Sequence, residues 1–322
     1  MAQIHCEDWR DLSPAAMSLL YAHERERWLQ ALNWDPAPSF AEVERARAAG
    51  EVPGFVARRG QHLLGWTFFL LHQATLQIGA LNGTSAGIVR QLLERVLATP
   101  ESDMAKRLSC FVFPDNPALM SALVRRRFEL RPQQYLTRLL APGDWRQRLG
   151  ATGAWAADGT RVRTWAITEA ADCVRILARA YETQPGAECF APGGRIDEWA
   201  QYFGQLMNTP GCGTWVPAAS FVVEAKGAGA PVGLIVTTAV SPSTAHVAQV
   251  AVDPAWRGRG FGRLLVQAAS AAALDAGYNR ITLLVDTANT PARMLYDRLG
   301  FVPGPQFLFG TRKSQTRVSS AA

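Results

Sequence analysis

The stretch Arg257-Gly258-Arg259-Gly260-Phe261-Gly262 decides the fold of this chain. Ahead of it, the mostly apolar run HVAQVAV (residues 246–252), which contains three β-branched valines, predicts a strand that ends at the turn signal Asp253-Pro254. Behind it, the run 264–274 predicts a helix, and Gly277 suits the position after its end. Glycines that open a helix let an anion approach backbone N–H groups at the positive end of the helix dipole. The stretch therefore predicts a phosphate or pyrophosphate site, to which the side chains of Arg257, Arg259 and Arg263 add positive charge.

Two common phosphate-binding loops do not fit this hexapeptide. A P-loop needs a Gly-Lys-Ser/Thr ending, which is missing here, and a dinucleotide loop needs Gly-x-Gly-x-x-Gly, whose spacing differs. The residues resemble instead the Arg/Gln-x-x-Gly-x-Gly/Ala signature of the GNAT superfamily of N-acetyltransferases. In that family the signature holds the pyrophosphate of acetyl-coenzyme A.

A second segment strengthens this resemblance. The run NTPARMLYDRLGF (residues 289–301) is similar to the family's second cofactor element, an Asn followed by a short helix that carries a Tyr and ends in Gly-Phe. Local chemistry predicts Thr290 as the N-cap, Pro291 as the first helical residue and Gly300 just after the helix. The resemblance covers roughly residues 160–312 and implies a mixed α/β domain that uses acetyl-CoA as co-substrate.

Length and composition set limits on the rest of the chain. With 322 residues and 48% hydrophobic residues, the chain is long enough for two domains with sizeable cores. No run of about 20 apolar residues and no signal peptide is found, so we expect a cytoplasmic protein away from membranes. Five scattered cysteines predict neither disulfides nor a metal site. The net charge of +6 fits an anionic cofactor at least as well as nucleic acid, and we expect no nucleic-acid partner.

The first half of the sequence repeats the second half. Residues 55–71 match residues 221–236, and residues 115–128 match residues 288–301, with offsets that drift from 166 to 173. We therefore predict two tandem GNAT-like α/β domains, an arrangement that resembles mycothiol synthases. The expected boundaries are a degenerate N-terminal domain at 1–140, a linker at 141–160, a catalytic domain at 161–313 and a flexible tail at 314–322. The alternative is an accidental likeness between two α/β domains.

The repeat does not keep the residues that carry the chemistry. At an offset of 172, the three glycines of the loop fall on Ala86, Ile88 and Arg90. At an offset of 173, Leu123 and Arg127 stand where the second half has Tyr296 and Gly300, although Asn116 still matches Asn289.

Acetyl transfer to an amine needs a base for the amine, donors for the developing oxyanion and an acid for the departing thiolate. The resemblance assigns the base to His246, with Tyr296 as acid. The backbone of Val250, Ala251 and Val252 would meet the pantetheine arm and the thioester. The resemblance also implies that the Asn289 side chain forms hydrogen bonds with pantetheine. Strand alternation would place His246 on one face with Ala248, Val250 and Val252. The alternatives are that His246 and Tyr296 only pack.

The acceptor side of the site is the least determined. Four acidic residues and an aromatic cluster lie in the variable region of the second domain, and they indicate either a pocket for a cationic amine or a solvated surface over a packed core. These residues are Glu182, Glu188, Asp197 and Glu198, with Tyr181, Phe190, Trp199, Tyr202 and Phe203.

The sequence as a whole predicts direct acetyl transfer, in a ternary complex, from acetyl-CoA to a primary amine of a small molecule. We expect a monomer or homodimer. The alternatives are a non-catalytic acyl-CoA-binding regulatory protein and an acetyltransferase that acts on proteins or peptides.

Overall fold

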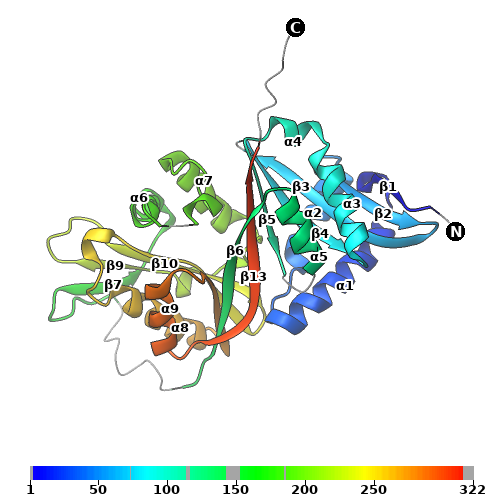
Figure 1. Cartoon of the computed structure of the whole chain (residues 1–322). Coiled ribbons are helices and arrows are strands. Elements are labelled where there is room, and N and C mark those ends of the chain that lie inside the picture. Colours follow the sequence, from blue (N-terminus) through cyan, green and yellow to red (C-terminus); the bar gives the residue numbers. More distant parts are fainter. Residues whose placement is uncertain (1–2, 73, 114–116, 143–152, 185, 315–322) are drawn as a thin grey trace, which may run out of the picture. The chain divides into compact units, whose positions relative to one another are not determined.

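A computed structural model of the chain describes residues 3–72, 74–113, 117–142, 153–184 and 186–314 (Figure 1). Asn116, the glycines at 143 and 150 in the expected linker, and the tail after Ser314 lie outside the described residues. The chain forms two compact units that are not contiguous in sequence. Unit 1 consists of Met1–Arg27, Phe40–Gln133 and Gln306–Ala322, and unit 2 of Trp28–Ser39 and Gln134–Pro305. The domain boundaries expected from the sequence stay a prediction.

Unit 1 is a mixed sheet with helices on both faces. Its strands follow the order β1-β2-β3-β4-β5-β13. Apolar residues of α3 and α5 pack on one face, among them Leu92 and Leu123, while Trp9, Met17 and Trp66 belong to a separate cluster. Its elements are β1 (His5–Asp8), α1 (Pro14–Leu32), α2 (Ala37–Ala48), β2 (Gly54–Arg59), β3 (His62–His72), β4 (Thr75–Gly83), α3 (Ala86–Leu97), α4 (Pro100–Met104), β5 (Arg107–Val112), α5 (Pro117–Arg125), and parts of β6 (Glu129–Leu139) and β13 (Val302–Lys313).

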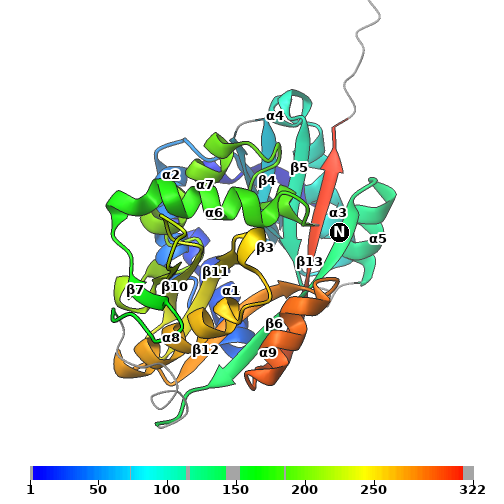
Figure 2. The ribbon, with the colours of Figure 1, turned by 90° about the vertical axis from the view of Figure 1, so that its left-hand side faces the viewer.

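Unit 2 repeats this layered design. Its strands follow the order β6-β12-β11-β10-β9-β7, with the short β8 paired to β10. Helices α8 and α9 cover one face of the sheet, and α6 and α7 cover the opposite face (Figures 1 and 2). Its elements are β7 (Thr160–Thr164), α6 (Ala170–Tyr181), α7 (Ile196–Asn208), β8 (Thr214–Trp215), β9 (Phe221–Ala225), β10 (Gly233–Ser241), β11 (Thr244–Val252), α8 (Phe261–Asp275), β12 (Arg280–Asp286) and α9 (Thr290–Arg298).

Strand register shows that the two units are repeats of one another. In unit 1, a bulge in the β3–β4 pairing lies between Phe68 and Phe69, and parallel pairing of β4 with β5 runs up to Ile78 opposite Cys110. In unit 2, the same bulge lies between Val236 and Thr237. Parallel pairing of β11 with β12 runs up to Val247 opposite Leu283. A chance likeness between two α/β domains would not reproduce both the bulge and the end of the parallel pairing.

The ends of α5 and α9 confirm the expected offset of 173. Gly300 follows α9 with a φ of 77°, and Arg127 takes the same left-handed conformation after α5 with a φ of 60°. In both places the next residue, a Phe, donates its N–H to a carbonyl five residues earlier, that of Tyr296 or Leu123. The predicted end of α8 is also confirmed, since Gly277 follows it with a φ of 92°. The two repeats therefore keep one backbone while their side chains diverge.

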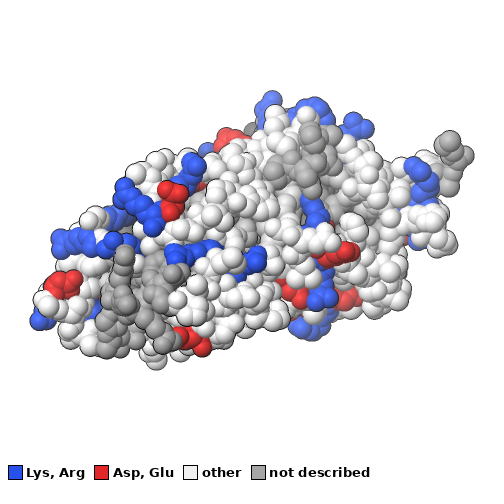
Figure 3. Space-filling view, turned by 90° about the horizontal axis from the view of Figure 1, so that it is seen from below, with Lys and Arg blue, Asp and Glu red and all other residues white. Residues whose placement is uncertain are grey.

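Basic side chains on the face shown in Figure 3 lie in separate groups with uncharged surface between them. Within the described part of the chain, the search for a helix long and apolar enough to cross a membrane finds no candidate.

Candidate functional site

The start of α8 has the geometry that an anion site requires. Gly260 stands at the N-cap position with a φ of 82°, and it offers no side chain to bond the first N–H groups of the helix. Those groups have no partner within a helix, so they are free to bind a ligand. Gly258 is also left-handed, and a Cβ at either glycine would meet no atom within 4 Å. The open space and the glycine conformations leave the backbone accessible from outside.

The side chains of Arg257, Arg259 and Arg263 have different surroundings. Arg257 donates from its guanidinium to the Ala180 carbonyl at 2.6 Å, near the end of α6, and to the Val252 carbonyl at 3.3 Å. Arg259 lies over the ring of Trp256, 4.5 Å from its centroid, and Arg263 is exposed on the first turn of α8. Arg257 therefore ties the loop to α6, whereas Arg263 presents its charge to solvent.

The edge of β11 opens just before this loop. Parallel pairing with β12 ends at Val247, although β11 continues to Val252 and β12 to Asp286, all of them described residues. Beyond Val247, the backbone of β11 on its β12 side has no strand partner. An extended chain such as a pantetheine arm could pair with these groups.

A bulge at Ala248 interrupts the alternation of side chains along β11. The prediction that His246 shares one face with Val250 and Val252 is therefore wrong. Val250 and Val252 pack against the cluster that contains α8. Ala248 packs instead against the cluster that contains α6 and α7. The cause is the extra residue in the pairing, because Val236 opposes Gln249 while Thr237 opposes Val247. Alternation restarts after the bulge, which puts Val250 and Val252 on the opposite face from His246.

His246 lies in an aromatic surrounding within unit 2. Its side chain is 6% exposed, and its Nδ1 is 2.9 Å from the Thr282 hydroxyl oxygen. The ring centroid is 4.9 Å from that of Trp34 and 6.1 Å from that of Tyr135. Burial lowers the pKa of His246 from 6.5 to about 3, because the charged imidazolium would lose its hydration. The imidazole is therefore neutral at ordinary pH.

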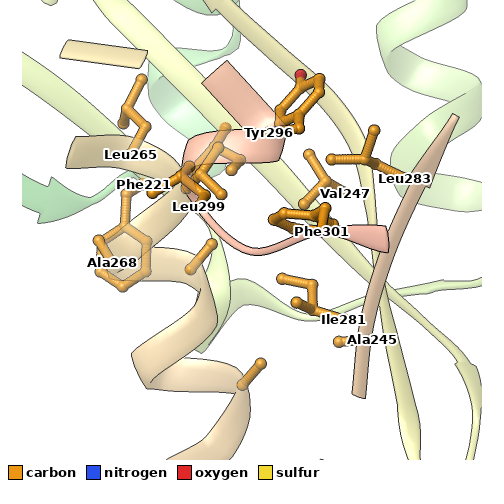
Figure 4. Close-up of a cluster of buried hydrophobic side chains, with 14 of the residues drawn as sticks. Phe221, Ala245, Val247, Leu265, Ala268, Ile281, Leu283, Tyr296, Leu299 and Phe301 are labelled. Carbon is orange, nitrogen blue, oxygen red and sulfur yellow. The ribbon is translucent and has the colours of Figure 1, made fainter. Parts of the chain in front are cut away.

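Tyr296 lies with its ring in the α8 side of the core and its hydroxyl pointing out of it (Figure 4). The ring is 6% exposed and meets Phe301 edge-on at 5.7 Å. Burial is the main cause that raises the pKa of Tyr296, and the nearby Tyr181 adds to the effect. The phenol therefore keeps its proton, which is the state required of an acid.

Asn289, rather than Thr290, caps α9. The Asn289 Oδ1 accepts the Ala292 N–H at 3.2 Å, and Thr290 is already the first residue of the helix. The prediction of Thr290 as N-cap is wrong because both residues are good caps and the turn after β12 places the asparagine first. The Asn289 side-chain NH₂ group remains the part of this residue that could donate to a ligand.

A buried glutamine joins two tyrosines, and sequence reasoning missed it. The Tyr181 hydroxyl donates to the Gln249 Oε1 at 2.8 Å, and the Gln249 Nε2 donates to the Tyr202 hydroxyl oxygen at 2.7 Å. Gln249 is 4% exposed. Its signal in the sequence was a lone polar residue inside an apolar strand, which indicates a buried hydrogen-bonded group.

Comparison with known proteins decides the family. Residues 176–301, which contain β11, the glycine loop and α9, match the acetyltransferase (GNAT) family. This segment is a GNAT acetyltransferase domain. The chain is also similar to the mycothiol acetyltransferase of Beutenbergia cavernae, with 27% identity over 281 residues that cover 81% of this chain and 85% of that protein.

Solved structures show the same tandem fold. The crystal structure of a GCN5-related N-acetyltransferase from Sphaerobacter thermophilus is similar over 96% of this chain and 95% of its own, with a TM-score of 0.64 and 15% identity. A tandem GNAT protein from the clavulanic acid biosynthesis pathway is similar over 81% of this chain and 82% of its own, with a TM-score of 0.57 and 17% identity. The prediction of a tandem GNAT architecture is confirmed.

Two of the acidic residues expected around the acceptor, Asp197 and Glu198, make contacts within their own segment. Glu198 is buried and accepts the Gly193 N–H at 2.6 Å, and Asp197 is paired with Arg195. The described residues include no group of three or more side chains that could together hold a metal ion. Glu198 therefore serves the entry into α7 and is not part of an acidic rim.

Proposed function

We propose that unit 2 transfers the acetyl group of acetyl-CoA directly to a primary amine of a small molecule. The observation that carries the proposal is the start of α8, which has no side-chain cap and where open space lies at the Cβ positions of Gly258 and Gly260. The chain's similarity over most of its length to a mycothiol acetyltransferase supports a small acceptor.

The loop and the adjacent strand edge would hold the co-substrate. The pyrophosphate would accept hydrogen bonds from N–H groups of residues 258–262, with charge from Arg259 and Arg263. The thioester would lie against the open edge formed by Val250, Ala251 and Val252, and the Asn289 amide would donate to pantetheine. Backbone N–H groups at the thioester carbonyl stabilise the oxyanion that forms when the amine attacks.

Tyr296 is proposed to supply the proton that the leaving group needs. As the amine nitrogen bonds to the acetyl carbon, the carbon–sulfur bond breaks and the thiolate accepts the phenolic proton. The raised pKa of Tyr296 keeps that proton in place until negative charge develops on sulfur.

His246 is proposed to take the proton from the amine through water, and this role has the weaker support. Burial keeps the imidazole neutral, as a base must be. A pKa of His246 lowered to about 3, however, leaves little driving force for accepting a proton. Entry of water or substrate beside the ring would restore its basicity by improving hydration of the imidazolium.

Release of free coenzyme A thiol tests the proposal. The protein would be mixed with acetyl-CoA and amino sugars, amino acids, aliphatic diamines or a peptide with a free N-terminus. We expect amine-dependent thiol release and an N-acetyl product by mass spectrometry for at least one small amine. Turnover confined to the peptide would favour a protein acceptor. Binding of acetyl-CoA without turnover of any amine would contradict the proposal.

A further inference from the structure

The hydrogen bonds around Gln249 have fixed directions. The Oε1 of an amide can only accept and the Nε2 can only donate. The Tyr181 proton is therefore committed to Gln249, and the Tyr181 oxygen keeps its lone pairs free to accept another hydrogen bond. Tyr202 has the opposite role, because its oxygen accepts from Gln249.

Tyr181 is joined by hydrogen bonds to two parts of the proposed site. Its hydroxyl donates to the Oε1 of Gln249, the residue before Val250 on the open edge of β11. On the other side, the loop residue Arg257 donates to the carbonyl of Ala180, the residue before Tyr181. Burial raises the pKa of Tyr181 itself to about 12, so its hydroxyl keeps its proton at working pH. Tyr181 is thus connected to the phosphate loop through its neighbour Ala180 and to the open edge of β11 through Gln249.

An attacking amine needs an acceptor at this place. A neutral primary amine has two N–H donors and one lone pair, and the lone pair must point at the acetyl carbon. A hydrogen-bond acceptor that takes one N–H fixes the rotation of the amine, whereas a donor would compete for the lone pair. Tyr181 is such an acceptor only while Gln249 holds its proton.

We infer that Gln249 is a positioning residue for acetyl transfer, which makes Tyr181 a hydrogen-bond acceptor for the N–H of the attacking amine. This inference rests on the proposed function. It assigns the recognition of the amine to a neutral acceptor on α6 rather than to a carboxylate.

Steady-state kinetics of four variants test the inference, with the small amine that the wild type turns over best. Gln249→Met removes both hydrogen bonds at nearly constant volume, and Tyr181→Phe removes the acceptor. Each should lower kcat by about 10- to 100-fold while the KM for acetyl-CoA stays within threefold. The double variant should be no slower than either single variant, because both changes remove one function.

Two further variants show whether Gln249 positions Tyr181 or only fills space in the core. Gln249→Glu still accepts the Tyr181 proton and should retain most of the kcat. Tyr202→Phe removes the bond at the other end of the amide and should lower kcat by less than a third of the loss seen with Gln249→Met. A wild-type kcat in Gln249→Met, or additive losses in the double variant, would overturn the inference while leaving the proposed function intact. Absence of amine turnover by the wild type would overturn the proposed function and this inference together.

Discussion

Helices α3 and α8 occupy the same place in the two repeats, yet they begin differently. Ser85 caps α3 by accepting the Ile88 N–H, and Ile88 is buried against Gly65 and Gly83. Only Thr84 lies between β4 and Ser85, whereas residues 253–259 separate β11 from Gly260 at the start of α8. In unit 1 a side chain caps the helix, whereas in unit 2 the corresponding N–H groups have no side-chain cap. The length of a short connection thus decides whether these N–H groups are capped from within the chain.

The largest expected effect is at the glycine loop. Gly260→Glu should weaken acetyl-CoA binding at least 100-fold, about 2.7 kcal/mol, because a carboxylate would meet the pyrophosphate. Isothermal titration calorimetry measures the change in Kd. Gly227→Glu is the matched control, since Gly227 has a φ of 84° and Gly260 one of 82°, and neither has an atom within 4 Å of an added Cβ. Both variants share the strain and the charge, so equal losses of affinity would show that the effect is not local to α8.

A change at Tyr296 tests whether the two repeats differ in chemistry as well as in structure, because the corresponding residue in unit 1 is Leu123. Tyr296→Phe should lower kcat by about 100-fold, because the thiolate would leave without its proton. The Kd for acetyl-CoA should stay within threefold. Single-turnover kinetics with a small amine measure the loss. An unchanged kcat would mean that Tyr296 only packs.

His246 stands where unit 1 has Gln77, so His246→Gln makes the repeats alike at this position. The native pKa of about 3 lies below the unfolded value of 6.5. As the pH falls below 6.5, His246 binds a proton in the unfolded chain but stays neutral in the native chain. The free energy of unfolding therefore decreases. Between pH 7 and pH 5, urea denaturation of the wild type should show about 2 kcal/mol more loss than that of the variant. If the free energy of unfolding changed equally with pH in the wild type and in His246→Gln, the imidazole would be solvated in the native protein.

The smallest expected effect is at the ends of α5 and α9. Arg127 has a φ of 60° where its counterpart is Gly300. Arg127→Gly should therefore raise the free energy of unfolding by about 0.5–1 kcal/mol, because glycine adopts this conformation without strain. Urea denaturation measures the gain, and Arg125→Gly at the last residue of α5, where φ is not positive, is the control that should lose stability. A loss in Arg127→Gly would mean that the arginine side chain contributes more than its backbone costs.

The sequence predicted features that depend on a few neighbouring residues. The strand, glycine turn and helix at 246–274, and the left-handed glycines 277 and 300, follow from local chemistry. The bulge at Ala248 could not be predicted, because no glycine or proline marks it and the pairing with β10 creates it. The fixed offset of 172 misplaced the loop of unit 1, because the shorter connection before α3 puts Ser85, not Ile88, opposite Gly260. Gln249 was missed because its partners come from α6 and α7, far away in the sequence.

The stoichiometry of acetyl-CoA binding tests the central difference between the repeats most directly. Calorimetric titration of the full chain should give one site per chain, since of α3 and α8 only α8 begins with uncapped donors at a glycine loop. Two sites per chain would contradict the account, because α3 would then bind the co-substrate despite its serine cap and its buried Ile88.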